Sequence, residues 1–325
     1  MKSLVEIIKK NDSLTKVLLP VYQRVRYGGG GPLYKWPMKA LLKLDLKMYK
    51  DGHGNSFDYQ HPVLFTEKIQ HYKYWYNHPD INRITDKVTF KEYINSKLGD
   101  GYVIPMFDAW SSIEALEEEW NNGTKLPNEF VLKSNLQSNG RCIKIVRDKS
   151  AVDFAELKKE LQEWLMIENT LMNSISRHLY WSKPMIIAEK YMSNFDNQLY
   201  DYKFFCFNGE PYCMYSAIDQ FEDGKNTDAY PIMFYDLDWK KMDVKYGHHP
   251  NYADVPKPTH FGEMIVLAKK LSAEFPFLRV DFFDTEDKLY LAELTFDPGG
   301  GFTPYYPISF NKQLGDLMPF PNKNS

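Results

Sequence analysis

The sequence predicts an α+β fold with a mostly antiparallel sheet in its C-terminal half. Three observations favour this class. Segments with helical periodicity and short apolar segments both recur along the chain. Two apolar segments meet at the turn Asn208-Gly209, which is typical of a hairpin. Two further apolar segments flank the turn Thr285–Lys288 and predict a second hairpin near the C-terminus.

The individual elements follow from the same periodicities. Helices are expected at 65–77, 85–99, 112–122, 151–169 and 261–275. Strands are expected within 102–110, 130–135, 141–148, 184–192, 199–219, 231–242 and 279–295. Thr66 is the expected N-cap of the first of these helices, and Asp51–Asn55 is an expected turn. Residues 1–50 predict helices that are interrupted at Gly28–Pro32.

Composition limits the classes of protein that this chain can belong to. Its 325 residues, with 43% hydrophobic side chains and a net charge of −3, suit one large or two modest globular domains. Three cysteines without a CxxC pair predict neither a disulfide framework nor a zinc site, which fits a reducing compartment. We find no apolar segment of membrane-spanning length and no signal-peptide pattern, so we expect a cytoplasmic protein.

The positive charge is concentrated at the N-terminus. Residues 1–50 hold 11 Lys and Arg against 3 Asp and Glu, while the rest of the chain is acidic. One interpretation is a solvated basic helix pair. The other is a surface for an anionic lipid or an acidic polymer, which would place the protein at the inner face of the plasma membrane. Nucleic acid is not an expected partner, because no recognised binding motif accompanies the charge.

Two carboxylates lie where the second hairpin can bring them together. Asp281 and Glu293 are 12 residues apart, with the turn between them. Like charges repel unless a cation neutralises them, and Mg²⁺ prefers oxygen ligands. Arg279 and Thr295 each lie two residues from one of the acids and share their face. The pattern predicts a magnesium site beside a guanidinium that can stabilise an anion. A hairpin with surface carboxylates is the alternative.

A loop with almost no side chains follows the hairpin. Asp297-Pro298 precedes Gly299, Gly300 and Gly301. Bare backbone amides allow a phosphate or carboxylate to approach closely. We therefore expect a substrate contact here, or otherwise an ordinary glycine turn.

Other segments supply matching parts. Lys133 ends a strand and precedes a polar loop that closes at Gly140, which suits contact with ATP phosphates. Lys87 lies at a helix start, where phosphate can bind. Glu189 ends an apolar strand that could face an adenine edge, and Asp201 and Lys203 share one face of a strand. The alternatives are an exposed hairpin lysine, a capped helix, a solvated strand end and a cross-face ion pair.

The order of these motifs resembles the ATP-grasp superfamily and, more closely, the TupA-like ATP-grasp family. The resemblance covers roughly residues 60–310. Its marks are TDK (85–87), LPxxFVLKSN (126–135), DYKFFCFNG (201–209), RVDFF (279–283) and ELTFDPGGGF (293–302). It implies an ATP-grasp fold, in which two α+β subdomains grip ATP. The expected division is a basic helical extension (1–60), an N-terminal part (61–125), a small subdomain with the phosphate loop (126–190) and a catalytic subdomain (191–325).

The resemblance also implies roles for residues. The expected nucleotide contacts are Lys87, Lys133, Ser134, Asn135, Ser138, Asn139, Gly140, Glu189, Lys190, Tyr191, Asp201 and Lys203. The expected catalytic residues are Arg279 and Lys203, and the expected ligands of one or two Mg²⁺ are Asp281, Glu293 and Thr295. The expected substrate contacts are Arg279, Asp297, Gly299, Gly300 and Gly301.

The implied chemistry is ATP-dependent activation of a carboxylate as an acylphosphate, followed by attack of an amine. TupA-like proteins are associated with cell-surface polymers. The resemblance therefore implies a ligase that joins an amino acid or amine to a uronic acid carboxyl group of a capsular or cell-surface polysaccharide or its lipid- or nucleotide-linked precursor. The alternatives are an ATP-dependent sugar kinase, a glycosyltransferase using the Asp236-x-Asp238 pair, and a binding module without catalysis.

Overall fold

The chain divides into two compact units, Met1–Ser56 and Phe57–Ser325. The computed structural model describes residues 35–136, 142–165, 182–192, 200–218, 221–222, 225–226, 230–251, 255–285 and 287–320. Each helix within these ranges is too short or too polar to span a bilayer. The predicted break at Gly28–Pro32 lies outside the described residues.

The first unit contains one described helix, α3 (Lys35–His53). It continues through Asp51, so the predicted turn at Asp51–Asn55 begins too early. The helix stops before Gly54, whose φ of 76° is incompatible with a right-handed helix. Lys43, Lys47 and Lys50 are exposed at a spacing of four and three residues, which places them along one side of the helix.

Five described helices of the second unit lie within the ranges that the periodicity predicts, and two, at Ile81–Thr85 and Ile308–Leu317, were not predicted. Together they are α4 (Phe65–Trp75), α5 (Ile81–Thr85), α6 (Lys87–Leu98), α7 (Ile113–Asn122), α8 (Phe154–Trp164), α10 (Phe261–Ser272) and α11 (Ile308–Leu317). The predicted cap Thr66 is wrong, because α4 already begins at Phe65. The Glu67 carboxylate accepts the amides of Val63 and Leu64 at 2.7 and 2.9 Å and so closes this helix end.

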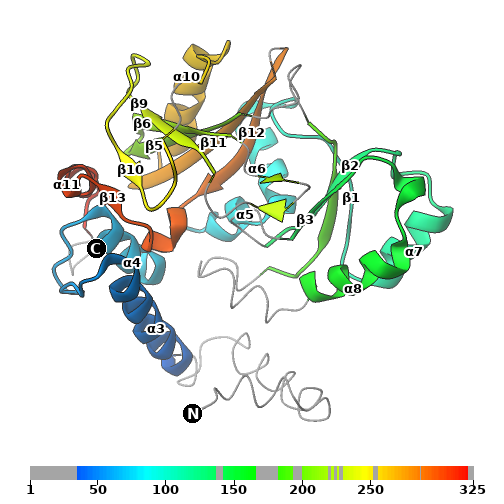
Figure 1. The fold of residues 1–325 in the computed structure, drawn as a ribbon, viewed down its shortest axis with the longest axis horizontal. Coiled ribbons are helices and arrows are strands. Elements are labelled where there is room, and N and C mark those ends of the chain that lie inside the picture. Colours follow the sequence, from blue (N-terminus) through cyan, green and yellow to red (C-terminus); the bar gives the residue numbers. More distant parts are fainter. Residues whose placement is uncertain are drawn as a thin grey trace. The chain divides into compact units, whose positions relative to one another are not determined.

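A four-stranded antiparallel sheet forms one layer of this unit. Its order is β1 (Met106–Trp110), β4 (Ile186–Glu189), β2 (Phe130–Ser134) and β3 (Ile143–Val146). Helices α7 and α8 lie together against one face of the sheet (Figure 1). Trp120, Phe130 and Phe154 belong to the hydrophobic core between them. Strand β1 and helix α7 precede the predicted small subdomain (126–190) in the sequence, but they belong to the same sheet and core as its strands β2, β3 and β4.

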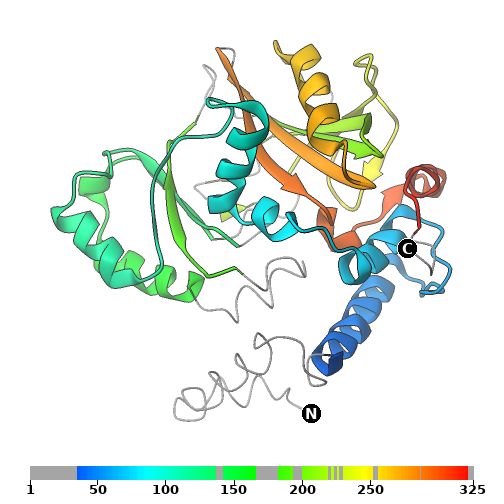
Figure 2. The same cartoon turned by 180° about the vertical axis from the view of Figure 1, so that it is seen from behind.

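A five-stranded antiparallel sheet forms the larger layer. Its order is β12 (Lys288–Thr295), β11 (Phe277–Thr285), β5 (Asp201–Phe207), β6 (Glu210–Ala217) and β9 (Ile232–Tyr235). This confirms the mostly antiparallel sheet that the sequence predicts. The turn between β5 and β6 has φ values of 50° at Asn208 and 83° at Gly209, as the Asn-Gly pair requires. Helix α10 covers one face of the sheet (Figure 2).

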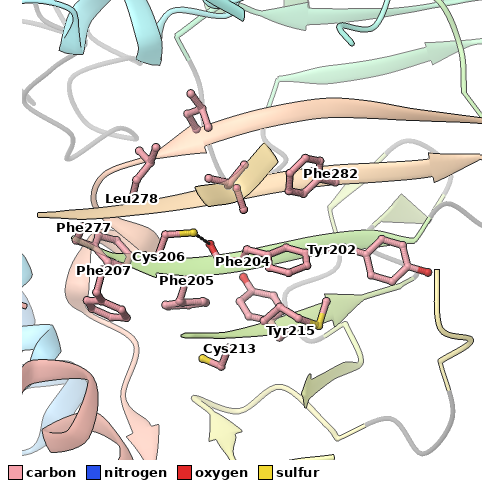
Figure 3. Close-up of a cluster of buried hydrophobic side chains, with 14 of the residues drawn as sticks. Tyr202, Phe204, Phe205, Cys206, Phe207, Cys213, Tyr215, Phe277, Leu278 and Phe282 are labelled. Atoms are coloured by element: carbon pink, nitrogen blue, oxygen red, sulfur yellow. Dashed lines mark hydrogen bonds between the residues drawn. The ribbon is translucent and has the colours of Figure 1, made fainter. Parts of the chain in front are cut away.

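The alternation along the central strands separates the core from a polar face. Phe204 and Phe282 are fully buried. The centroid of the Phe204 ring lies 5.9 Å from that of Phe261 on α10 and 5.6 Å from that of Phe282. Figure 3 shows how closely the aromatic side chains of β5, β6 and β11 pack. Because successive side chains point to opposite faces, the residues next to these phenylalanines face away from α10. That second face carries Arg279 and Asp281.

The remaining elements are short. Strands β10 (Lys245–Tyr246) and β13 (Tyr305–Tyr306) form a two-stranded sheet, as do β7 (Phe221–Glu222) and β8 (Lys225–Asn226). Two short 3-10 turns are η1 (Lys149–Ala151) and η3 (Pro298–Gly301). The turn η3 leads from β12 towards β13, so the glycine loop directly follows the strand that carries Glu293.

Candidate active site

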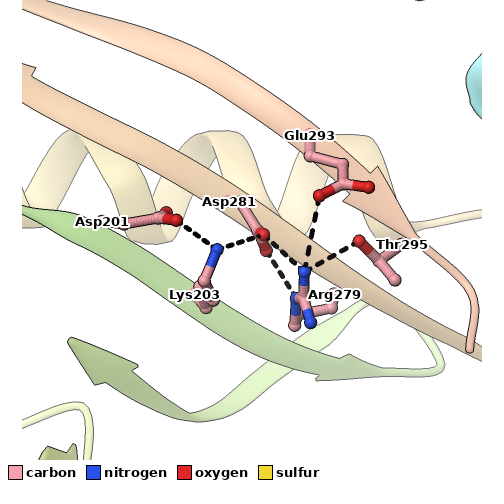
Figure 4. Close-up of polar contacts among 6 residues, drawn as sticks. All are labelled: Asp201, Lys203, Arg279, Asp281, Glu293 and Thr295. Atoms are coloured by element: carbon pink, nitrogen blue, oxygen red, sulfur yellow. Dashed lines mark hydrogen bonds and ion pairs between the residues drawn. The ribbon is translucent and has the colours of Figure 1, made fainter. Parts of the chain in front are cut away.

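Three neighbouring strands bring charged side chains to one face of the five-stranded sheet. Asp281 of β11 lies opposite Glu293 of β12 on one side and opposite Lys203 of β5 on the other. Arg279 lies opposite Thr295 in the adjacent row. Because paired residues share a face, all five converge, as Figure 4 shows. The structure therefore brings together the residues that the hairpin pattern singled out.

The Asp281 carboxylate is the centre of this cluster. Arg279 binds it through two hydrogen bonds, from Nε at 2.7 Å and from Nη2 at 2.6 Å. Lys203 Nζ donates to the same carboxylate at 2.8 Å. The Asp281 side chain is completely buried, so this ion network is shielded from solvent. Removing one member of such a network should strongly destabilise the protein, because the remaining charge would stay buried without its counter-ion.

Glu293 and Thr295 are held more loosely. Arg279 Nη2 donates to Thr295 Oγ1 at 3.0 Å and lies 3.7 Å from Glu293 Oε2. The Glu293 side chain is 40% exposed. A carboxylate that is partly exposed next to a buried one can accept an incoming cation without first breaking a tight ion pair.

Electrostatics fixes the protonation states of the cluster. Burial lowers the pKa of Lys203, but Asp201 and Asp281 outweigh burial and raise that pKa well above its usual range. Lys203 contacts the carboxylates of both acids. Burial alone would also lower the pKa of Arg279, yet Asp281 drives it well above normal. Both cations therefore stay charged, so they can stabilise anions but cannot act as general bases.

The donor set fits a hard divalent cation that shares its ligands with phosphate. Asp281 and Glu293 offer carboxylate oxygens at paired positions, and Thr295 adds a hydroxyl in the next row. Among the described residues, no group of three or more His, Cys, Asp or Glu side chains could hold a metal ion. Mg²⁺ does not need such a group, since one or two carboxylates plus substrate phosphates suffice. The three residues are thus compatible with Mg²⁺ bound together with a nucleotide.

A second charged cluster joins helix α6 to the four-stranded sheet. The Glu189 carboxylate lies between two lysines, with Lys133 Nζ at 2.8 Å from Oε2 and Lys91 Nζ at 2.5 Å from Oε1. Burial raises the pKa of Glu189, but Lys133 and Lys91 together lower that pKa to about 2. Glu189 is therefore ionised at any physiological pH.

Lys87 links the two clusters. Burial lowers the pKa of Lys87, while Glu293 and Glu189 act in the opposite direction and Lys133 adds to the effect of burial. The Lys87 amide also donates to the Asn135 carbonyl just after β2, at 3.3 Å, and α6 contacts β12, so this helix lies beside both sheets. This is the arrangement that a bound polyphosphate would need, because its charge must be met from both sides.

The predicted phosphate loop is only partly described. Ser138, Asn139 and Gly140 lie outside the described residues. Ser134 is buried, and its amide donates to the Cys142 carbonyl at 3.0 Å. Of the three cysteines, Cys206 and Cys213 are buried, whereas Cys142 is partly exposed directly after the loop.

Asn135 corrects the prediction of a direct nucleotide contact. Its side chain is fully buried and bonded to protein on both ends. Nδ2 donates to Asp86 Oδ2 at 2.9 Å and to the Lys183 carbonyl at 3.0 Å, while Oδ1 accepts the Met185 amide at 2.8 Å. Asp86 in turn caps α6 by accepting the Val88 amide. Asn135 therefore holds the helix start that carries Lys87, and it does not face a ligand.

The predicted adenine segment continues from Glu189 into Lys190 and Tyr191. The Lys190 amide donates to the Pro105 carbonyl at 2.9 Å, and its side chain is exposed. Arg147 stacks 3.7 Å above the Tyr191 ring and donates to its hydroxyl at 2.5 Å. The ring thus has a fixed position at the strand end, and its contact with adenine stays a prediction.

The glycine loop is left-handed and partly bonded to itself. Gly299, Gly300 and Gly301 have φ values of 57°, 59° and 70°, which side-chain-bearing residues rarely adopt. The Gly300 amide donates to the Asp297 carbonyl at 2.8 Å. This amide is already used, so it does not offer the bare contact for an anion that the sequence predicted. A substrate contact of Asp297 and the other two glycines stays a prediction.

Protein packing also explains why the loop lacks side chains. A Cβ on Gly299 would lie 2.3 Å from the Tyr246 hydroxyl, and one on Gly301 would lie 2.7 Å from Gln70 Nε2. From the α4 side, Gln70 Nε2 and Lys73 Nζ both donate to the Gly300 carbonyl, at 2.7 and 2.9 Å. The loop is therefore held between Tyr246 of β10 and the α4 residues Gln70 and Lys73, which are all distant from it in sequence.

Comparison with known proteins decides the family. The profile described as TupA-like ATP-grasp matches residues 67–319, which is most of the chain. This chain belongs to the TupA-like ATP-grasp family. The ATP-grasp fold that the sequence predicts is thereby confirmed.

Solved structures with a similar fold include a D-alanine–D-alanine ligase from Bacillus anthracis, at 15% identity and a TM-score of 0.36, covering 66% of this chain and 57% of that one. A carboxyaminoimidazole ribonucleotide synthase from Aspergillus clavatus, solved with ATP, matches at 17% identity and 0.37, covering 66% and 45%. A RimK domain ATP-grasp protein from Sphaerobacter thermophilus matches at 12% and 0.38, covering 73% and 68%. The chain thus spans about half the length of the first two. No curated protein matches the sequence.

The TupA-like chain uses residues that sequence patterns could not single out. Lys91 joins the Glu189 cluster across 98 positions of the chain, and Gln70 and Lys73 reach the glycine loop across more than 220. The four-residue spacing of Lys87 and Lys91 places both on one side of the helix, but this spacing alone does not distinguish Lys91 from other helical lysines.

The Asp236-x-Asp238 pair is part of a turn. Asp236 Oδ1 accepts the amides of Asp238 and Lys240 at 2.9 and 2.8 Å. The Asp238 side chain is 77% exposed and lies 3.3 Å from Lys240 Nζ. Asp236 therefore closes the turn, as expected for a strand end, and nothing in this geometry favours a glycosyltransferase site.

Proposed function

We propose that this TupA-like protein is an ATP-dependent carboxylate–amine ligase that attaches an amino acid or amine to a uronic acid carboxyl group of a cell-surface polysaccharide or its precursor. One observation carries the proposal. Lys87 begins α6, its amide donates to the Asn135 carbonyl just after β2, which carries Lys133, and α6 also contacts β12. Strand β12 carries Glu293, which lies beside Asp281, and Arg279 and Lys203 bind that buried acid. A nucleotide triphosphate with Mg²⁺ is complementary to this distribution of charge.

In the proposed complex, Lys133 and Lys87 contact the phosphates, and the segment from Glu189 to Tyr191 contacts adenine. Asp281 and Glu293 hold Mg²⁺, with Thr295 as a third oxygen. The metal, when bound, neutralises the phosphate oxygens and so lowers the energy of the charge that develops during transfer.

The first step forms the acylphosphate. A carboxylate oxygen of the uronic acid attacks the γ-phosphorus, and the bond from that phosphorus to the β-bridging oxygen breaks to release ADP. Lys203 stays protonated between Asp201 and Asp281, so its charge can face the transferred phosphoryl group throughout.

The second step forms the amide. The amine nitrogen attacks the acyl carbon, the C–N bond forms, the C–O bond to phosphate breaks, and the proton lost by the amine leaves with phosphate or water. Arg279 carries a permanent charge beside this position and is held by two bonds to Asp281, so it is preorganised to stabilise the tetrahedral oxyanion.

The acceptor class is supported by family resemblance and by the basic N-terminus. The exposed row Lys43, Lys47 and Lys50 on α3 suits an acidic polymer or an anionic lipid surface. Replacing Arg24, Arg26, Lys39 and Lys43 with Gln should weaken binding to a polyuronate or to anionic vesicles in co-sedimentation. Unchanged binding would remove this part of the proposal.

The direct test measures ADP and inorganic phosphate released from Mg²⁺-ATP in the presence of uronic acid glycosides and a panel of amino acids and small amines. A ligase releases both products only when a uronate and one amine are present together. ADP without phosphate, accompanied by a stable phosphosugar, would indicate a kinase instead. Glu293→Gln, purified in the same way, is the companion variant, because release that falls with this replacement originates at the proposed metal site and not in a contaminating ATPase.

A further inference from the structure

Lys91 is a buried cation that the proposed chemistry does not use. It lies one helical turn after Lys87 on α6, and its side chain is 11% exposed. Its Nζ contacts Glu189 Oε1 at 2.5 Å and donates to the Ile104 carbonyl at 2.7 Å. Burial lowers the pKa of Lys91, and Glu189 opposes this shift. Burying an ammonium group is costly, so its position calls for an explanation beyond packing.

The two lysines that share Glu189 differ in how they are held. Lys91 is anchored by the Ile104 carbonyl as well as by the carboxylate. Lys133 binds the other oxygen at 2.8 Å, and its side chain is 20% exposed, about twice as much as that of Lys91. Of the pair, Lys133 is the one with room to turn towards a ligand while Lys91 stays in place.

We propose that Lys91 is a positioning residue of the nucleotide site, which neutralises Glu189 so that Lys133 can leave this carboxylate and bind phosphate. The proposal rests on the nucleotide site described above. Lys91 and Lys133 are the two lysines described in ion pairs with Glu189, so without Lys91 this almost fully buried carboxylate would depend on Lys133 for such a contact. Moving Lys133 to the phosphates would then leave the buried Glu189 carboxylate without this ion pair. Removing one partner from a buried ion pair is strongly unfavourable.

The test is a double-mutant cycle on nucleotide binding, measured by calorimetry with Mg²⁺ and a non-hydrolysable ATP analogue on the full chain. Lys91→Met should raise the Kd about tenfold or more, because the coupled charges lie in contact. In a Glu189→Gln background the same replacement should change the Kd by less than about twofold, since no stranded charge remains. Lys91→Arg should restore most of the affinity.

The matched control is Lys97→Met. Lys97 lies on the same helix but is 40% exposed and pairs with Glu274 at 2.9 Å on the surface, so its loss should leave the Kd unchanged. Circular dichroism and thermal melting identify any variant that does not fold, and Lys91→Arg keeps the cycle interpretable in that event.

The outcomes separate this proposal from the proposed function. If the unaltered protein does not bind the nucleotide, the proposed function fails and Lys91 has no such role. If it binds, and Lys91→Met binds equally well, the Lys91 proposal alone is overturned. An equal loss in both backgrounds also overturns it, because a lysine with a merely structural role would weaken binding regardless of the charge on Glu189.

Discussion

Asp281 and Glu293 lie opposite each other on paired strands, yet one side chain is completely buried and the other is 40% exposed. The buried acid is committed to Arg279 and Lys203. The exposed acid is the more adaptable ligand. This asymmetry means that the two carboxylates differ in what their removal does to the protein.

Glu293→Gln should lower turnover by roughly 100-fold or more while the protein stays folded. The replacement removes one oxygen charge from the proposed metal site, and even indirect metal partners commonly contribute 10–100-fold. Because Glu293 is partly exposed and lies 3.7 Å from Arg279 Nη2, the melting temperature should change little. Phosphate release and thermal melting measure the two effects. A turnover close to that of the unaltered protein would refute the metal assignment.

Arg279→Ala should reduce kcat by about 100- to 1,000-fold, as removal of an oxyanion donor does elsewhere, with a smaller change in ATP affinity. The reason is that its proposed role follows ATP binding. Steady-state kinetics with saturating acceptor separates kcat from the KM for ATP.

Arg279→Lys is the companion variant, because it keeps a cation beside the buried Asp281 and so protects the fold. It should retain the melting temperature better than Arg279→Ala while remaining slow. If both variants weaken only ATP binding, the assigned role is wrong.

Gly301→Ala should destabilise the protein by about 1–3 kcal/mol, the strain of a left-handed non-glycine residue. Its φ is 70°, and a Cβ would lie 2.9 Å from the Thr66 carbonyl oxygen, which is backbone and cannot move aside. Chemical denaturation measures this free energy of unfolding.

Gly262→Ala is the matched control for that measurement. It is the second residue of α10 and has no heavy atom within 4 Å of a new Cβ, so the same replacement should be neutral or stabilising by up to about 1 kcal/mol. Equal effects at both glycines would contradict the proposed packing of the loop.

His71 should make the protein sensitive to acid. Burial lowers the pKa of His71 from 6.5 to about 4. As pH falls from 6.5 to 4, the unfolded chain binds a proton here and the folded chain does not, so the stability declines in this window and the His71 contribution levels off below it. Melting temperatures recorded between pH 4 and 7.5 reveal the slope.

His71→Phe should flatten that slope, since phenylalanine can still pack against Phe320, whose ring lies 4.4 Å from the His71 ring. An unaltered pH profile in His71→Phe would show that other groups control the acid response.

The sequence predicts the local and periodic features of this fold well. The second hairpin was predicted because a recognisable turn separates two apolar segments, and because Arg279 and Asp281, like Glu293 and Thr295, lie two residues apart and share a face. The period of a strand alone would place Asp281 opposite Ala292. A register shift between Asp281 and Phe282, which the sequence did not reveal, places it opposite Glu293 instead. Helix α4 was predicted, but its cap was not, because Glu67 closes the helix end from inside.

Contacts between distant segments could not be predicted in the same way. Asn135 looked like part of a phosphate loop, and only the structure shows that its amide group is used up by Asp86, Lys183 and Met185. Lys91 resembles any other lysine on a helix until Glu189 is seen beside it. Such roles depend on packing between elements, which single-sequence periodicity does not encode.

The placement of the three cysteines has a practical consequence. Cys206 and Cys213 are sealed in the core, where burial raises the pKa of both thiols and suppresses their reactivity, whereas Cys142 is partly exposed next to the predicted phosphate loop. A maleimide fluorophore should therefore label the native protein at one position without any engineered cysteine. Its emission would follow nucleotide docking in real time, so the order in which the substrates bind could be resolved by stopped flow.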